Sequence, residues 1–135
     1  MTDYGKKFDL FVNIVRQLRS KSGCPWDREQ SPSTLKRYLL EETRELLEAI
    51  DTQNEHHIKE ESGDLLYLII LLAQIYEEDA HYDIGDVLNT VTAKMIRRHP
   101  HVFADEKITS VADLRQKWLE IKKSEKTTHN DPEKN

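Results

Sequence analysis

The sequence predicts an all-α protein, and three observations support that fold class. Apolar residues recur every three to four positions along most of the chain, which is the spacing of a helix that buries one face. The 135 residues include only four glycines and four prolines, so helix-breaking residues are scarce. No segment alternates apolar and polar residues in the manner of a half-buried strand. We therefore expect a helical bundle of four to five helices, forming a single domain over residues 1–123 and completed by dimerisation.

The N-terminal half predicts two helices separated by a loop. The first helix is expected over residues 4–20, where one apolar stripe recurs at helical spacing. A loop is expected over residues 21–32, because glycine and two prolines interrupt the helical pattern there. The second helix is expected over residues 33–51, with the hydroxyl of Ser31 or Ser33 capping its N-terminus.

The C-terminal half predicts three more helices. A long helix is expected over residues 54–79, and its centre, residues 65–72, is apolar nearly all round. Such a centre must be buried on several sides, and a second subunit is one way to bury it. Asp83 can cap a fourth helix, which ends before Pro100 because proline disfavours helical geometry at the preceding residue. A shorter helix is expected over residues 110–123.

Composition and charge exclude several classes of protein. The net charge of −5 argues against a general nucleic-acid binder, which is usually basic. The longest apolar run, residues 65–75, is shorter than the roughly 20 residues that span a membrane. The first residues lack the apolar segment of a secretory signal, and the single Cys24 cannot form an intramolecular disulfide, so we expect a cytoplasmic protein. The polar segment 124–135 is expected to be disordered.

Two pairs of carboxylates are the most informative local feature. Glu42 and Glu45 stand three residues apart on one expected helix, and Glu61 and Asp64 do so on the next. Residues at this spacing share one helix face, and the flanking sequence is strongly apolar. Four carboxylates meeting between two helices would repel one another unless a cation lay among them, and such oxygen ligands suit Mg²⁺ or Mn²⁺. Spacing alone leaves open the alternative of two solvated helix faces.

Other residues with functional chemistry also have alternative interpretations. A di-iron site would need two Glu-x-x-His motifs from different helices, and only residues 78–81 have that spacing. The basic residues Lys94, Arg97 and Arg98 suit the C-terminus of a helix whatever else they do, and they could bind phosphate if they faced the acids. Trp26 could pack in the core or stack on a base.

Several segments, taken together, resemble the MazG nucleoside triphosphate pyrophosphohydrolases. They are C-P-W-D-R-E-Q at 24–30, Y-L-L-E-E-T-R-E at 38–45, E-E-S-G-D-L-L at 60–66 and R-R-H-P-H-V-F at 97–103. In this resemblance the E-E-x-x-E and E-x-x-D patterns mark a wider all-α group of pyrophosphohydrolases. The first and last segments narrow it to the MazG branch, and the likeness covers about residues 8–122.

The resemblance implies a dimeric or higher-order enzyme that uses Mg²⁺, or alternatively Mn²⁺. Such an enzyme cleaves nucleoside triphosphates to monophosphate and pyrophosphate, with water attacking the α-phosphorus. The residues implied by position are metal ligands at Glu42, Glu45, Glu61 and Asp64, a general base or neighbour of the ligands at Glu41, phosphate contacts at Lys94, Arg97 and Arg98, and a base contact at Trp26. Arg37 departs from the family pattern, in which proline is frequent at that position.

Two rival functions remain open from the sequence. One is a non-catalytic helical protein that uses its apolar third helix for dimerisation or another interaction. The other is a related all-α hydrolase that acts on dUTP, dCTP or phosphoribosyl-ATP. The C-P-W-D and R-R-H-P-H-V-F segments favour the MazG branch over the second rival, through resemblance alone.

Overall fold

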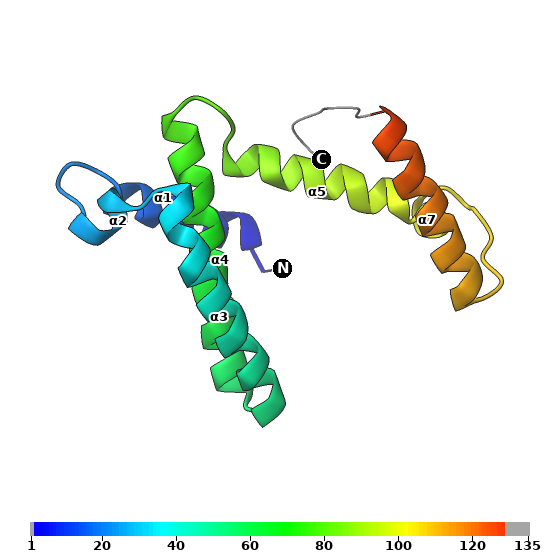
Figure 1. Ribbon diagram of the computed structural model, residues 1–135, viewed down its shortest axis with the longest axis horizontal. Helices are drawn as coiled ribbons and strands as arrows, with labels where there is room; N and C mark the ends of the chain where they lie inside the picture. The colour runs from blue at the N-terminus through cyan, green and yellow to red at the C-terminus, as the bar shows by residue number, and fades with distance from the viewer. Residues whose placement is uncertain (1, 129–135) are drawn as a thin grey trace. The chain divides into compact units, whose positions relative to one another are not determined.

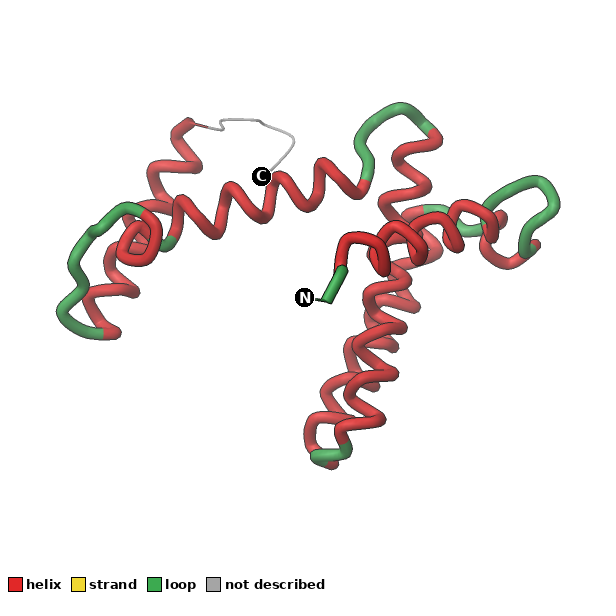
Figure 2. The backbone as a smooth tube through the Cα atoms, turned by 180° about the vertical axis from the view of Figure 1, so that it is seen from behind, coloured by secondary structure: helices red, strands yellow, loops and turns green. Residues whose placement is uncertain are grey.

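The protein is helical throughout the part that the structure describes, as the sequence predicts. A computed structural model describes residues 2–128, and no strand occurs in that range (Figures 1 and 2). The helices are α1 Tyr4–Leu18, α2 Pro25–Glu29, α3 Pro32–Thr52, α4 Glu55–Glu78, α5 Ile84–Arg98, α6 Pro100–Phe103 and α7 Val111–Thr128. Within this described range, no helix combines the length and the apolar character needed to cross a membrane.

The first turns of α3 and α4 are fixed by side-chain caps. Ser31 is the N-cap of α3: its Oγ accepts a hydrogen bond from the Thr34 N–H at 3.2 Å, and the Thr34 hydroxyl oxygen accepts one from the Ser31 N–H at 2.9 Å. The Oδ1 atom of Asn54 accepts from the His57 N–H at 3.2 Å and so caps α4. Between them, Gln53 adopts a left-handed backbone conformation with φ of 58°, and the chain reverses. The two long helices therefore run antiparallel, side by side (Figure 1).

Two expectations about helix boundaries were wrong, and one was incomplete. The expected loop over residues 21–32 contains α2, because Pro25 occupies its first turn, where the missing N–H of proline is tolerated. Pro100 ends α5 as expected, but it also begins α6 for the same reason. Helix α7 continues to Thr128, so residues 124–128 of the segment expected to be disordered are helical. The remainder of that segment lies outside the described residues.

The chain divides into two compact units, Met1–Val87 and Leu88–Asn135, and the assignment of a single domain over 1–123 stays a prediction. In the first unit, α1 and α3 both pack against α4 (Figure 1). The largest fully buried side chains there are Val15, Leu35, Ile70 and Leu71. This core holds α3 and α4 together along the faces that carry the paired acids.

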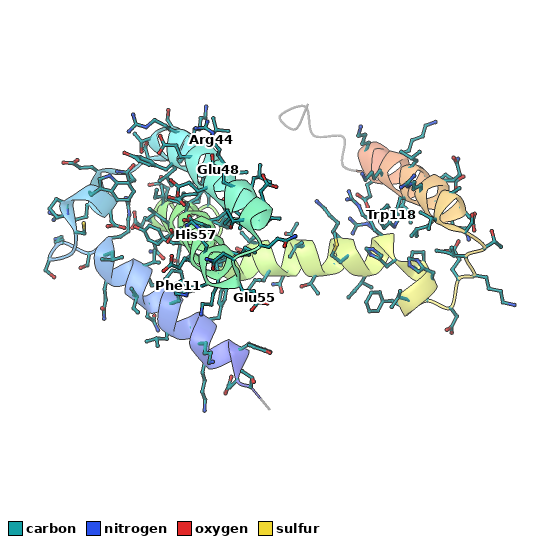
Figure 3. The ribbon with its side chains drawn as sticks, turned by 90° about the horizontal axis from the view of Figure 1, so that it is seen from below. Phe11, Arg44, Glu48, Glu55, His57 and Trp118 are labelled. Atoms are coloured by element: carbon teal, nitrogen blue, oxygen red, sulfur yellow. The ribbon has the colours of Figure 1, made fainter. Side chains whose placement is uncertain are left out.

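The second unit is organised around α7. Trp118 on this helix meets the ring of His99 edge-on at 5.4 Å (Figure 3). Glu125, two turns further along α7, receives hydrogen bonds from Arg97 and Arg98 at the end of α5. An aromatic contact and an ion-pair network therefore connect α5, α6 and α7.

Candidate active site

The antiparallel pairing of α3 and α4 brings the acids of the two sequence motifs together. Glu42, Glu45 and Glu61 each place a carboxylate oxygen within 4.8 Å of the others. Asp64, one turn after Glu61, is near enough for its charge to raise the pKa of both Glu42 and Glu61. All four predicted acids thus belong to one electrostatic cluster, which we call the acid cluster.

Two oxygens of the acid cluster are buried without any hydrogen-bond partner. They are the Oε2 atoms of Glu42 and Glu61. Buried polar atoms are nearly always paired in proteins, so an unpaired one indicates a missing partner. Carboxylate oxygens are the ligands that Mg²⁺ and Mn²⁺ prefer, so these residues fit a divalent cation.

The pKa values of the acid cluster show that its negative charges are poorly compensated. Burial and, after it, the neighbouring charge of Glu45 are the main causes that together raise the pKa of Glu42 to about 7. Burial also raises the pKa of Glu61. Within the described residues no lysine or arginine forms an ion pair with the cluster, and the nearest basic contact is His57 Nε2, 3.6 Å from Glu61 Oε1. Without a cation, the cluster is therefore short of positive charge.

The remaining acids of these helices lie outside the cluster. Glu41 is exposed, one residue before Glu42, and its side chain has no hydrogen bond or ion pair in the described part of the chain. Glu48 is also exposed, and Glu60 is exposed and pairs with His56 at 3.1 Å (Figure 3 shows Glu48). Glu48 and Glu60 are therefore solvated charges and serve as controls for the cluster.

Trp26 borders a pocket at the N-terminal end of α3. Its indole stands edge-on to the ring of Tyr38, with ring centroids 5.1 Å apart, and it is 37% exposed. The pocket has a volume of about 460 Å³, and its lining residues are Trp26, Glu29, Gln30, Ser33, Thr34, Arg37 and Tyr38. The indole is therefore accessible to a ligand rather than confined to the core.

A buried polar network fixes α2, and with it Trp26, against the rest of the unit. The hydroxyl of Tyr67 on α4 donates a hydrogen bond to the buried carboxylate of Asp27. Arg19 Nη1 donates to the carbonyl oxygens of Asp27 and Gln30 at 2.7 and 3.1 Å, and Nη2 of the same arginine pairs with Glu78. Tyr67 lies one turn beyond Asp64, so α2 is tied to the helix that carries half of the acid cluster. Sequence reasoning missed this network.

With this geometry established, the chain can be compared with known proteins. Residues 30–103 match the MazG nucleotide pyrophosphohydrolase domain, and this segment is more than half of the chain and contains the whole acid cluster. The chain belongs to the MazG family. The resemblance inferred from the motifs is therefore confirmed.

Similar proteins include two curated relatives and one solved structure. The uncharacterised protein YabN of Bacillus subtilis (strain 168) is 47% identical over 122 residues, which are 90% of this chain and 25% of YabN. The nucleoside triphosphate pyrophosphohydrolase/pyrophosphatase MazG of Thermotoga maritima is 45% identical over 126 residues, 93% of this chain and 48% of that protein. The crystal structure of a mazG-related protein from Thermotoga maritima has a TM-score of 0.70 at 33% identity, covering 85% of this chain and 98% of that one. The chain thus spans about half or less of these curated relatives.

Two of the three basic residues predicted to bind phosphate are already engaged within the second unit of this MazG chain. Glu125 accepts from Arg97 Nε at 3.0 Å and from Arg98 Nη2 at 3.1 Å. These hydrogen bonds, with that of Arg98 the stronger, lower the pKa of Glu125 to about 2. Lys94 is half-buried and forms no ion pair in the described residues. A phosphate-binding role for these three basic residues stays a prediction, and Glu125 was not anticipated because it lies in the segment expected to be disordered.

A second open pocket of the MazG chain lies between α1 and α4. Its volume is about 400 Å³, and it is lined by Phe11, Gly63, Asp64, Leu66 and Tyr67 (Figure 3 shows Phe11 on α1). A Cβ atom added to Gly63 would meet nothing within 4 Å, so packing within the described chain does not require glycine there. Leu66 and, one turn further, Ile69 are exposed on the same face of α4. This side of the long apolar helix is therefore not covered by the other helices of the first unit.

Proposed function

We propose that this chain is a Mg²⁺-dependent nucleoside triphosphate pyrophosphohydrolase. It hydrolyses ribo- or deoxyribonucleoside triphosphates to the monophosphate and pyrophosphate, with water attacking the α-phosphorus. The observation that carries the proposal is the pair of buried, unpartnered oxygens of Glu42 and Glu61, in a cluster that no lysine or arginine of the described residues pairs with. Membership of a family described as nucleotide pyrophosphohydrolases supports the same reaction.

The acid cluster is the proposed metal site. Glu42, Glu45, Glu61 and Asp64 would hold the ion through their carboxylate oxygens. A bound Mg²⁺, or Mn²⁺ in its place, supplies a Lewis acid that offsets the charge of the triphosphate. Because two helices of one packed hairpin carry these four side chains, the carboxylates are positioned before the substrate arrives.

Other residues of the chain are assigned to the remaining parts of the reaction. Glu41, exposed beside the cluster, is proposed to accept the proton of the attacking water. Lys94, Arg97 and Arg98 are proposed to bind phosphate oxygens, with the two arginines held ready by Glu125. Trp26, whose indole is accessible, is proposed to contact the base.

We also propose that the working enzyme is a homodimer. The uncovered side of α4, with Gly63 in open space and Leu66 and Ile69 exposed, supports the packing of a second copy there. Light scattering of the purified chain should give twice the monomer mass, and Ile69→Glu should reduce it to the monomer mass. A monomeric parent protein would contradict the proposal.

The proposed reaction is tested by identifying its products. The purified chain is incubated with a panel of nucleoside triphosphates and Mg²⁺ in isotope-labelled water. Pyrophosphate and a monophosphate carrying the label should appear, whereas orthophosphate and a diphosphate would contradict attack at the α-phosphorus. Glu42→Gln and Asp64→Asn should abolish turnover while circular dichroism shows intact helices. The matched controls Glu48→Gln and Glu60→Gln should remain active, and full activity of both cluster variants would overturn the site assignment.

A further inference from the structure

The pocket beside Trp26 contains two opposite charges that do not pair with each other. Glu29 and Arg37 both line it. Neither side chain forms an ion pair in the described residues, and Arg37 makes one hydrogen bond there, from Nη2 to the hydroxyl of Tyr38 at 2.9 Å. A ligand in the pocket can therefore use most of the guanidinium donors of Arg37 and the whole carboxylate of Glu29.

The amide in the same pocket is already committed. Gln30 Nε2 donates to the carbonyl oxygen of Trp26 at 2.9 Å, and Gln30 Oε1 accepts from the hydroxyl of Thr34 at 2.8 Å. A bidentate amide is the side chain that recognises adenine, because it matches one donor and one acceptor on that base. Gln30 cannot serve in this way without losing both contacts, so Glu29 and Arg37 determine which base the pocket prefers.

The pocket also has a surface on which a base can stack. The Trp26 indole is inclined at 74° to the Tyr38 ring, and Trp26 is 37% exposed, so a base can reach part of the indole surface. Stacking on an aromatic side chain binds any base with little discrimination. Affinity would therefore come from Trp26 and discrimination from the two charged residues.

The pocket is at a suitable position relative to the acid cluster. Arg37 and Tyr38 lie four residues before Glu41 and Glu42 on α3, which is about one helical turn of 5.4 Å. A base in the pocket would therefore leave its ribose and first phosphate near the carboxylates. One nucleotide can occupy both places, as the proposed function requires.

We propose that this pocket selects guanine, so that GTP and dGTP are the preferred substrates. The inference rests on the proposed function. Guanine presents O6 and N7 as paired acceptors, which match the guanidinium of Arg37, and the N1–H and N2 amine as paired donors, which match the carboxylate of Glu29. Adenine places an amine where Arg37 needs an acceptor. Cytosine offers Glu29 a single donor group, so it satisfies the pair less completely.

Substrate analogues test each half of the recognition in the unmodified protein. With Mg²⁺, kcat/KM for GTP should exceed that for ATP by about ten- to a hundredfold, because each bidentate contact discriminates by about that factor. ITP, which lacks the N2 amine, and 7-deaza-GTP, which lacks N7, should each lose part of this advantage. Equal kcat/KM for GTP and ATP, or a preference for CTP, would overturn the inference and leave the proposed function intact. If no triphosphate is hydrolysed, the proposed function fails and this inference fails with it.

Two variants assign the halves to their residues. Glu29→Gln should lower kcat/KM for GTP and raise it for XTP, whose C2 carbonyl accepts from the new amide. Arg37→Met should lower kcat/KM for GTP more than for ATP, which offers Arg37 only N7, and should remove the difference between GTP and 7-deaza-GTP. Arg44→Met and Glu48→Gln, at exposed positions further along α3, are the matched controls and should keep the preference of the parent protein (Figure 3). Retention of that preference in both pocket variants would also overturn the inference.

Discussion

Two carboxylates of this protein are almost equally buried, yet their pKa values are shifted in opposite directions. The side chains of Glu61 in the first unit and Glu125 in the second are 12% and 14% exposed. The pKa of Glu61 is raised, first by burial and then by nearby acids. The pKa of Glu125 is lowered to about 2, because Arg98 and Arg97 donate hydrogen bonds to it. The difference lies in the charged groups that surround each carboxylate.

Glu125 is an acid that is paired within its own unit, whereas Glu61 is an acid proposed as a metal ligand. Glu125 has its cations within the same unit, so its charge is satisfied when that unit folds. Glu61 lies among Glu42, Glu45 and Asp64, and one of its oxygens has no partner. The chain therefore supplies the cations of one charge network itself, and the other has the unpaired oxygens that the proposed metal ion would fill.

The largest expected effect is on catalysis. Glu61→Gln keeps the shape of the side chain but removes a charge from the acid cluster. We expect kcat for pyrophosphate release to fall by about 10²–10³-fold, since charge stabilisation by a metal contributes several kcal/mol. Glu60→Gln, at the exposed neighbouring position, should retain the parent rate. A Glu61→Gln variant with the parent kcat would show that Glu61 resembles a solvated acid rather than a ligand.

The parts of the fold and site that could be predicted are those encoded by neighbours in sequence. The helical pairs Glu42 with Glu45 and Glu61 with Asp64 are three residues apart, so the shared face of each pair follows from helix geometry alone. The recurrence of apolar residues every three to four positions predicted the long helices in the same way. The prediction at Pro25 was wrong, because proline is found in the first turn of a helix as well as where a helix ends.

Contacts between distant residues could not be predicted from spacing. Tyr67 and Asp27 are 40 residues apart, and Arg98 and Glu125 are 27 apart. Each pairing depends on how helices pack, and the sequence around Asp27 contains no periodic signal that indicates its burial. The sequence motifs predicted a phosphate role for Arg97 and Arg98, but they could not show that Glu125 of the same unit already binds both arginines.

The next largest effect concerns metal binding without turnover. On the proposed function, Mg²⁺ binds the folded acid cluster and not the unfolded chain, so it should stabilise the first unit by about 2.7 kcal/mol at a hundredfold excess over its Kd. Denaturant unfolding followed by Trp26 fluorescence, in a Trp118→Phe background, measures this unit. Glu42→Gln combined with Glu61→Gln should remove the gain, whereas Glu125→Gln should keep it. A gain that persists in the double variant would place the ion elsewhere.

A smaller effect is expected at the network that Glu125 forms with Arg97 and Arg98. Glu125→Gln leaves two guanidinium groups without their carboxylate, which should destabilise the second unit by about 1–3 kcal/mol. The lower part of this range is expected, because Arg97 is 45% exposed and remains hydrated. Denaturant unfolding reported by Trp118, in a Trp26→Phe background, measures the loss. Glu61→Gln, by contrast, should leave the metal-free stability of its own unit equal or higher, because it removes a repelled charge.

The last effect is a pH dependence that should have opposite signs in the two units. The pKa of Glu42 is raised from 4.5 to about 7 in the folded protein. Its contribution to stability is therefore complete below pH 4.5 and is lost as the pH rises through 7. The pKa of Glu125 is lowered from 4.5 to about 2, so its contribution is complete above pH 4.5 and is lost as the pH falls towards 2.

In the presence of a chelator, Trp26 should therefore report a first unit that weakens between pH 4.5 and 7, while Trp118 reports a second unit that weakens only in acid. Saturating Mg²⁺ should abolish the first of these trends, since the bound ion holds the carboxylates in their charged form. If the metal-free first unit were equally stable at pH 5 and pH 7, the raised pKa of Glu42 in the acid cluster would be refuted. If Mg²⁺ flattened both trends, the two networks would not differ in the way that the structure indicates.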